Sequence, residues 1–502
     1  MFFQNKKNYF SNIFKRTSTL VLIFFLCFFV LLSSGRIASG DAGQQLQASM
    51  LFLTTGSLGT KIPPGGIDSG WVLSPNGNYY QPHDIGNVIL MLPAAFIGLI
   101  SSKLPALAIV ENPPIISKVI TSLSYACVNA IGCFFLFKLF RLYYKTRVAF
   151  LLSLAFPLTT MFGAYTKTAW DVVACCCINC SLLYYCAQII NGDKVKKNVV
   201  FVGLALGLAC SFRFSLIPFL GISVGFILFL VRHRLNWKDY ISCLMSFFVV
   251  MLPSFIYNYV RMGSPLRPAT TAPQYLEGNN ALTGNIIEGF LGLLFSPNRG
   301  LFLFSPILIL LFILPFIWNR ILVRQRDVFV AFSISSFLYL ILISKLKNWA
   351  AFGWGPRYLL PILPFLFFGA IITLIALWKN YRQAIIGLVL ISSLLSILPM
   401  FVNWEMAITV FPEALDSSAS LPTQQLAVWD GFILGIQGKP LPLKSNVDND
   451  SIRNTAAAKF PDLLTVRLAE TSSLGFLVGI TVSLILLVPI IFLFIRLSGI
   501  NF

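Results

Sequence analysis

The chain has 502 residues, of which 57% are hydrophobic and only 11% are charged. This composition excludes an ordinary soluble globular domain and is typical of a protein that crosses a membrane many times. The formal net charge of +19 would suit nucleic-acid binding, but the Lys and Arg residues lie in short segments beside apolar stretches. That arrangement is typical of membrane anchoring and argues against a nucleic-acid partner.

The apolar stretches approach or reach the length of about 20 residues that a membrane-spanning helix needs. In chain order they lie near residues 18–34, 148–165, 172–190, 240–260, 301–319, 328–344, 358–378, 383–402 and 474–496. Residues 198–231 are long enough for two short spans and predict a hairpin, with Ser211, Arg213 and Pro218 marking its turn.

Two further apolar segments, residues 86–110 and 115–140, lie between the first large polar loop and a basic cluster at residues 138–147. An odd number of crossings must connect that loop, which we expect outside, to that cluster, which we expect inside. One of the two segments is therefore re-entrant or hides a further crossing. We predict an all-α polytopic membrane protein with about 12–14 spans.

The Lys and Arg residues also orient the chain. By the positive-inside rule, the segments in which they concentrate face the cytoplasm. These segments are residues 6–16, 138–147, 194–197, 232–238, 320–326, 379–382 and the neighbourhood of Arg496. The remaining loops then face outward.

Unusual polar residues converge on that outer face. Asp41 opens the first outer loop, after the apolar segment that ends near residue 34. A carboxylate is costly to hold beside lipid, so this position suggests chemistry at the membrane surface. The other outer candidates are His83, Asp84, Asp171, Arg213, Arg261, Arg299, Lys345, Lys347 and Arg357. Cations on this face go against the positive-inside bias and need a reason beyond anchoring.

Two outer segments share one design. Residues 296–300 and 353–357 each place a proline and an arginine, Arg299 or Arg357, directly before an apolar span. A helix N-terminus beside a guanidinium is an anion site, and Lys345 and Lys347 add charge nearby. The expected anion is a lipid phosphate. The alternative is that these arginines only extend to lipid headgroups.

The order of motifs resembles a known superfamily. The segments are Asp41-Ala42-Gly43-Gln44-Gln45-Leu46-Gln47-Ala48, Thr55-Gly56-Ser57-Leu58 and Tyr80-Gln81-Pro82-His83-Asp84-Ile85-Gly86, followed by residues 258–265, 296–302 and 354–361. They resemble the GT-C glycosyltransferases, which take a sugar from a polyprenyl-phosphate carrier. The chain is most similar to glycosyltransferase family 39, the group of the protein O-mannosyltransferases and the lipid A aminoarabinose transferase, and to its uncharacterised bacterial relatives.

The resemblance covers residues 17 to 402 and implies a GT-C-like transmembrane catalytic domain over residues 1–402, with a first outer loop at 35–85. It also implies a multi-pass protein of the bacterial plasma (inner) membrane with its active site outside. Residues 403–473 match nothing in the group, and their Pro, Ser, Asn and Asp content predicts an exposed extracytoplasmic loop. Residues 474–502 are expected to form the final transmembrane helix and a short tail.

The resemblance assigns Asp41 as general base and makes Arg299 and Arg357 candidates for stabilising the departing lipid phosphate, with inversion at the anomeric carbon. Two departures weaken the match. Asp41-Ala42 replaces the usual acidic pair, and Gln81-Pro82-His83-Asp84 replaces a His-Pro-Pro type segment. Asp41 could also be a helix N-cap, with Gln44 at the capping-box position.

The sequence thus predicts a membrane glycosyltransferase whose acceptor is a lipid, glycan or protein hydroxyl. The alternatives are a flippase or transporter of lipid-linked sugars and an inactive relative that only binds the carrier. His83 and His233 are expected on opposite faces, which excludes a histidine-rich metal site. A divalent cation held by the carboxylates of Asp41 or Asp84 stays open.

Overall fold

The computed structural model describes residues 2–37, 40–64, 70–102, 114–268, 282–405, 421–437, 462–471 and 473–499. The first half of the chain forms α1 (Phe2–Leu32), α2 (Gly40–Thr55), β1 (Val72–Leu73), β2 (Tyr79–Tyr80), α3 (Ile85–Ser101), α4 (Ile115–Arg141), α5 (Thr146–Thr159), α6 (Phe162–Tyr165), α7 (Asp171–Asn191), α8 (Val195–Phe212), η2 (Phe214–Leu216), α9 (Ile217–Leu230), η3 (Arg232–Arg234) and α10 (Trp237–Met262).

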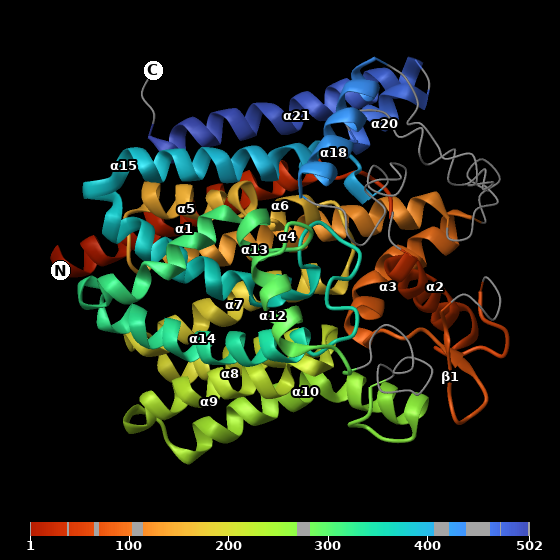
Figure 1. Ribbon diagram of the computed structural model, residues 1–502, viewed down its shortest axis with the longest axis horizontal. Coiled ribbons are helices and arrows are strands. Elements are labelled where there is room, and N and C mark those ends of the chain that lie inside the picture. Colours follow the sequence, from red (N-terminus) through yellow and green to blue (C-terminus); the bar gives the residue numbers. More distant parts are fainter. Residues whose placement is uncertain are drawn as a thin grey trace.

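The second half forms α12 (Ile286–Phe295), α13 (Leu301–Phe304), η5 (Pro306–Phe312), η6 (Leu314–Arg320), α14 (Val323–Ser344), η7 (Arg357–Ile362), α15 (Leu363–Phe401), α18 (Leu421–Ile436), α20 (Leu464–Thr471) and α21 (Ser473–Ser498). Most of these helices run side by side in one bundle, whereas α2, α3 and β1 lie together at its right-hand end in Figure 1. The antiparallel pair β1–β2 pairs Val72 with Tyr80.

The all-α polytopic fold class is confirmed. Among the described residues, seven helical segments are long and apolar enough to cross a membrane: α4, α7, α8, α10, α14, η7 with α15, and α21. Five shorter apolar helices accompany them. The longest segment contains a non-helical residue, Tyr381, so it is two helices joined at a kink. The total of about 12–14 spans stays a prediction.

The predicted hairpin at residues 198–231 is confirmed, with α8 and α9 joined at Arg213. The 301–319 segment differs from the continuous helix that we expected. It is divided into α13, η5 and η6, with Pro306 and Pro315 in the first turns of the two 3-10 helices. Proline lacks an N–H group and clashes with the preceding turn, which explains the breaks.

Helix α3 shows how the described part of the first early apolar segment lies. A β-carbon on Gly86, at its start, would lie 2.7 Å from the carbonyl oxygen of Ser211, at the end of α8. Gly98, near its end, packs against Ser117 at the start of α4. The end of α8 and the start of α4 lie at the same end of the bundle, so both ends of α3 lie there too. Of the described helices in the two segments, α4 is therefore the one that runs through the bundle, and residues 103–110 of the first segment lie outside the described residues.

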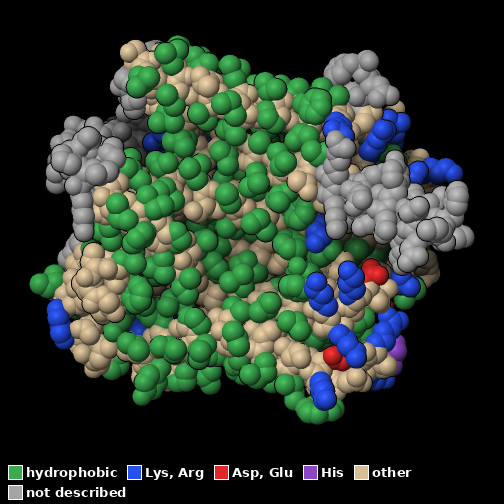
Figure 2. All heavy atoms as spheres, turned by 180° about the vertical axis from the view of Figure 1, so that it is seen from behind, with side chains coloured by type: hydrophobic (Ala, Val, Ile, Leu, Met, Phe, Trp, Pro, Cys, Tyr) green, Lys and Arg blue, Asp and Glu red, His purple; other side chains and the backbone are tan. Residues whose placement is uncertain are grey.

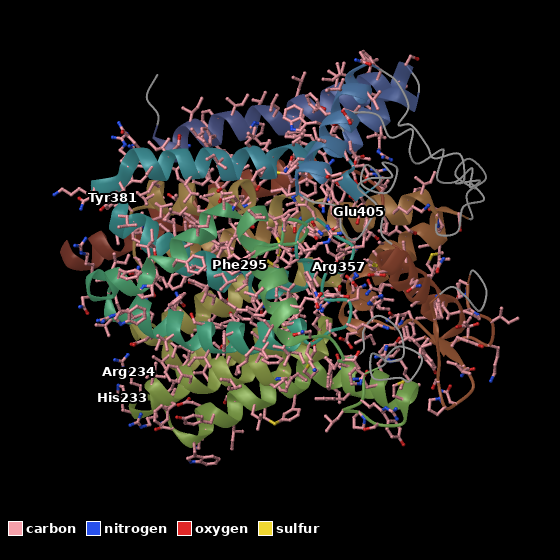
Figure 3. All side chains as sticks on the ribbon, in the orientation of Figure 1. His233, Arg234, Phe295, Arg357, Tyr381 and Glu405 are labelled. Carbon is pink, nitrogen blue, oxygen red and sulfur yellow. The ribbon has the colours of Figure 1, made fainter. Side chains whose placement is uncertain are left out.

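The cytoplasmic segments predicted from charge meet at one end of the bundle, here called the basic end. Gln325 donates a hydrogen bond of 3.0 Å to the Tyr144 hydroxyl, and the Arg234 guanidinium packs on Gly192 in the α7–α8 turn. Figure 2 shows a broad hydrophobic band across the molecule, with Lys and Arg gathered at the right-hand end. In Figure 3, His233, Arg234 and Tyr381 lie at one end, and Arg357 and Glu405 lie in the other half.

The core of the bundle is built around α7. Five of its cysteines, which as a cluster could have suggested a metal site, are buried. They are Cys175, Cys176, Cys177, Cys180 and Cys186. A buried free cysteine behaves as a small hydrophobic side chain. These five residues therefore act as packing groups. By contrast, α10 and α21 expose many large apolar side chains, as expected of lipid-facing helices.

Candidate active site

Helix α2 carries Asp41 and is fixed to its neighbours by buried polar contacts. Asn87 of α3 donates to the Gln45 side chain of α2 and, over 3.0 Å, to the carbonyl oxygen of Ala169. Ser49 of α2 donates to the carbonyl oxygen of Val88 over 2.9 Å. Buried polar groups of this kind specify one arrangement, because leaving any of them unpaired costs free energy. The first turn of α2 is thereby held against the loop before α7.

Asp41 lies in that first turn, between two cationic groups. Its Oδ1 atom is 3.7 Å from Nε2 of His83, and its Oδ2 atom is 3.7 Å from Nη1 of Arg357. Partial burial raises the pKa of this carboxyl, but His83, Arg357 and Arg213 lower it further than burial raises it. The net effect is a pKa well below the usual range, so Asp41 is ionised. Its side chain is 41% exposed, which leaves room for another molecule.

His83 is held by hydrogen bonds in the loop just before α3. Its backbone N–H donates to the Gln81 side chain over 2.6 Å, and its carbonyl oxygen accepts from Arg261 over 2.8 Å. Burial lowers the pKa of the imidazole, but the nearby carboxylates of Asp41 and Asp171 outweigh it, so the pKa of His83 is raised. The charged imidazolium form is therefore favoured beside Asp41.

Arg261 and Asp84 hold this loop on the bundle. Arg261 is completely buried and donates to the carbonyl oxygens of Gln81 and His83. Asp84 lies 3.9 Å from Arg261 and accepts a hydrogen bond of 2.8 Å from the backbone N–H of Phe214. The pair joins the loop to α10 and to the α8–α9 turn, so in this structure both residues position the site.

Arg357 points at Asp41 from the first residue of η7. Its guanidinium carbon lies 4.6 Å from the ring centre of Trp170 and 5.3 Å from that of Tyr358. The guanidinium carbon of Arg213 also lies 5.2 Å from the ring centre of Tyr358, and Arg213 pairs with Asp171 at 3.3 Å. These cation–π contacts restrict where each guanidinium can point. The predicted convergence of Asp41, His83, Asp171, Arg213 and Arg357 is thus present in the structure.

Arg299 differs from Arg357, although the sequence treats them as a pair. Only 3% of Arg299 is exposed, and its Nε donates to the carbonyl oxygens of Ala350 and Ala351 over 2.8 and 3.1 Å. Its Nη1 donates to Asn298 over 3.0 Å. The pKa of its guanidinium is lowered, mainly by burial. The neighbouring Tyr165 raises this pKa, whereas the charge of Arg357 lowers it further. Arg299 therefore fixes the loop that leads to Arg357 by pairing its carbonyl groups.

Lys345 and Lys347 are half-buried and exposed, respectively, at the end of α14. Within the described ranges, neither ammonium group forms an ion pair, so no contact links them to Asp41. The same part of the chain contains no group of three His, Cys, Asp or Glu residues that could hold a metal ion. The carboxylates of Asp41 and Asp84 are instead next to cationic side chains.

The sequence did not identify the contribution of the residues directly after α15. Trp404 donates a hydrogen bond of 2.7 Å to the carbonyl oxygen of Ala164 and lies 5.3 Å, ring centre to ring centre, from Tyr165. The next residue, Glu405, is buried at the site. Burial raises its pKa to about 7 against the opposing effect of Arg36 and Arg357. Residues 403–405, 421–437 and 462–471 are described parts of residues 403–473, and several of them contact the bundle. The extracytoplasmic loop expected over 403–473 stays a prediction, since many of its residues lie outside the described part of the chain.

Two solved structures are similar to this chain over nearly its whole length, although their sequences are distant from it. The chain is similar to the crystal structure of ArnT from Cupriavidus metallidurans bound to undecaprenyl phosphate, with 14% identity and a TM-score of 0.49 over 97% of this chain and 77% of ArnT. It is also similar to the oligosaccharyltransferase of Archaeoglobus fulgidus in complex with zinc and sulfate, with 13% identity and a TM-score of 0.29. That match covers 96% of this chain and about half, 53%, of the archaeal protein. No protein-family model and no curated protein sequence matches the chain.

Proposed function

We propose that this chain is a membrane glycosyltransferase that moves a sugar from a polyprenyl-phosphate carrier to a hydroxyl of an extracytoplasmic lipid, glycan or protein. One observation carries the proposal. The ionised, partly exposed carboxylate of Asp41 lies between His83 and Arg357, and Arg357 lies in the half of the apolar helical bundle away from the basic end (Figure 3). A carrier lipid lying in the membrane would present its phosphate at the level of such a group.

In this mechanism Asp41 is the general base. The acceptor hydroxyl attacks the anomeric carbon and passes its proton to the carboxylate of Asp41. A new carbon–oxygen bond forms as the bond between the anomeric carbon and the phosphate oxygen breaks, and the bonding electrons leave with the phosphate. Attack from the side opposite the leaving group inverts the anomeric centre. Arg357 balances the charge that develops on the departing phosphate.

The contact between Asp41 and Arg357 couples donor binding to the strength of the base. In this structure His83 and Arg357 lower the pKa of Asp41, and a carboxylate with a low pKa is a weak base. A phosphate group forms stronger charge-assisted bonds with a guanidinium than a carboxylate 3.7 Å away does. Donor phosphate would therefore draw Arg357 from Asp41 and make the carboxylate a stronger base only in the loaded site.

The experiment is a transfer assay on the purified full-length chain in lipid, following release of free polyprenyl phosphate from a panel of carrier-linked sugars. Asp41→Asn keeps the size of the side chain but cannot accept a proton. We expect its turnover to fall by roughly 10²- to 10⁴-fold while donor binding persists. The matched control is Asp430→Asn, which changes an exposed aspartate on α18. Near-normal turnover of Asp41→Asn would contradict the proposal.

A further inference from the structure

A second charged cluster, outside the group that surrounds Asp41, is centred on Asp462 at the start of α20. This carboxylate is 3% exposed and pairs with three cations. Its Oδ2 atom lies 2.9 Å from Arg36 Nη2 and 3.3 Å from Lys167 Nζ, and its Oδ1 atom lies 2.9 Å from Arg467 Nη2. Lys167 also donates a hydrogen bond to the backbone carbonyl of Asp462.

Buried positive charge exceeds buried negative charge in this cluster. The side chains of Arg36 and Lys167 are only 8% and 5% exposed, whereas Arg467 is 36% exposed and solvated. Glu405 is the other acid whose charge reaches Arg36, and its pKa of about 7 means that it is only partly ionised at neutral pH. Burial lowers the pKa of Lys167 to about 8 despite the attraction of Asp462. Two buried cations therefore share one fully ionised carboxylate.

Arg36 has a hydrogen-bond donor that the cluster does not use. Arginine and carboxylate commonly pair through two parallel hydrogen bonds, which engage two nitrogens of the guanidinium. Here Nη2 binds Asp462, but Nη1 is buried and, among the residues that the structure describes, has no hydrogen-bond partner. A buried donor without an acceptor is costly. The free donor and the excess charge both favour an additional anionic oxygen at this position.

The cluster adjoins the Asp41 site but is separate from it. Arg36 lies in the segment that joins α1 to α2, and Lys167 lies in the loop that leads to Asp171. The pKa of Glu405 is shifted by Arg36 and Asp462 of this cluster. It is also shifted by Asp41 and Arg357 of the other site, so the two groups of charges are neighbours. The ion pairs themselves are distinct, because Arg357 pairs with Asp41 and not with Asp462.

We propose that Arg36 and Lys167 form a second oxyanion site, which takes a phosphate group carried by a substrate. In this structure the carboxylate oxygens of Asp462 occupy the place of the oxygens of that phosphate. A phosphate entering the site takes over Lys167 Nζ and both terminal nitrogens of Arg36, and Asp462 keeps its pair with the exposed Arg467. This inference rests on the proposed function in one respect, because that function supplies a phosphate-bearing lipid as the ligand.

The test measures the dissociation constants of inorganic phosphate, a polyprenyl phosphate and the corresponding polyprenol on the purified full chain. All measurements use an Arg357→Ala background, which weakens the phosphate contact proposed near Asp41. Arg36→Gln and Lys167→Gln should each weaken phosphate binding by roughly 10- to 100-fold, the usual effect of losing a charge-assisted hydrogen bond. The matched control is Arg467→Gln, which removes the exposed cation from the same carboxylate and should change binding less than about threefold.

A second variant keeps the proposal testable if the buried substitutions prevent folding. Asp462→Asn removes the internal carboxylate but keeps its shape, so the uncompensated cations should bind phosphate more tightly, by roughly tenfold. Unchanged or weaker phosphate binding in Asp462→Asn would overturn the proposal. So would equal effects of Arg36→Gln and Arg467→Gln, which would indicate a purely structural ion cluster.

The three ligands identify the source of the phosphate. Binding of inorganic phosphate supports a site for the oxyanion alone, and binding of polyprenyl phosphate only supports a lipid-borne group. Polyprenol that binds as tightly as polyprenyl phosphate would overturn the oxyanion site. The two proposals can also fail separately. Loss of sugar transfer with intact phosphate binding would reject only the proposed function. Normal transfer, with phosphate binding that is unchanged by the substitutions at Arg36, Lys167 and Asp462, would reject only the second site.

Discussion

Asp41 and Arg357 lie 3.7 Å apart, although one lies in the first turn of α2 and the other begins η7 in the second half of the chain. The sequence led us to expect a base on one side of the substrate and a cation on the other. The structure instead places the two groups next to each other. The contact explains how a carboxylate can stay ionised at the edge of an apolar bundle, since the opposite charge stabilises it.

Arg357→Ala should raise the Michaelis constant for the carrier-linked sugar or lower turnover by on the order of 10- to 100-fold, because a charge-assisted contact to phosphate is lost. The pKa of Asp41 should rise at the same time, since one of the cations that lower it is removed. Steady-state kinetics across a pH series would measure both effects.

The control for this variant is Arg382→Ala, an exposed arginine near the kink at Tyr381. It changes the same side chain at the opposite end of the bundle and should leave both quantities unchanged. Donor kinetics of Arg357→Ala equal to those of Arg382→Ala would remove Arg357 from phosphate recognition.

Arg299→Ala should reduce stability more than donor affinity. Its side chain donates to the carbonyl oxygens of Ala350, Ala351 and Asn298. The carbonyl groups of Ala350 and Ala351, part-buried and buried, would lose this donor, whereas that of Asn298 also accepts from Gln424. Each buried group left unsatisfied costs about 1–3 kcal/mol. We therefore expect a lower thermal midpoint in detergent and a smaller folded yield. A variant with unchanged thermal midpoint but weakened donor binding would show that Arg299 contacts phosphate after all.

Much of the fold could be predicted from the sequence, because apolar length and basic flanks are local properties of the chain. The α8–α9 hairpin and the gathering of residues 138–147, 232–238 and 320–326 at one end follow from them. The path of α3 could not be predicted, because its 17 residues are nearly long enough to cross a membrane. Only its contacts with Ser211 and Ser117 show that it does not run from end to end.

The site was predictable where charge alone marks a residue. Asp41, Asp171, Arg213 and Arg357 are conspicuous because charges in outer loops beside apolar spans are costly without a role. The different uses of Arg299 and Arg357 could not be foreseen, since both follow a proline before a span and only the acceptors of Arg299 distinguish them. Asp462 was missed because a polar loop composition conceals a single buried carboxylate.

The sidedness of the two ends can be measured by cysteine labelling in intact cells. In a cysteine-depleted background, an impermeant reagent should label Lys347→Cys from outside but should reach Lys145→Cys only after the membrane is permeabilised. Both positions are exposed to solvent, so access depends on the side of the membrane and not on burial. Labelling of both positions from the same side of intact cells would contradict the orientation inferred from the basic segments.

Glu405 predicts how stability changes with pH. Burial raises its pKa from 4.5 to about 7, so between these values the folded chain binds a proton that the unfolded chain has lost. The contribution of Glu405 to stability is therefore fully present below about pH 4.5 and is lost as the pH rises to about 7. Glu405→Gln mimics the protonated acid and should remove this part of the decline, which thermal midpoints measured from pH 4.5 to 8 would show. The exposed Glu288 provides the matched control, since Glu288→Gln should leave the wild-type profile unchanged. If wild type and Glu405→Gln lose stability in parallel as the pH rises, the buried carboxyl of Glu405 is not the group that titrates.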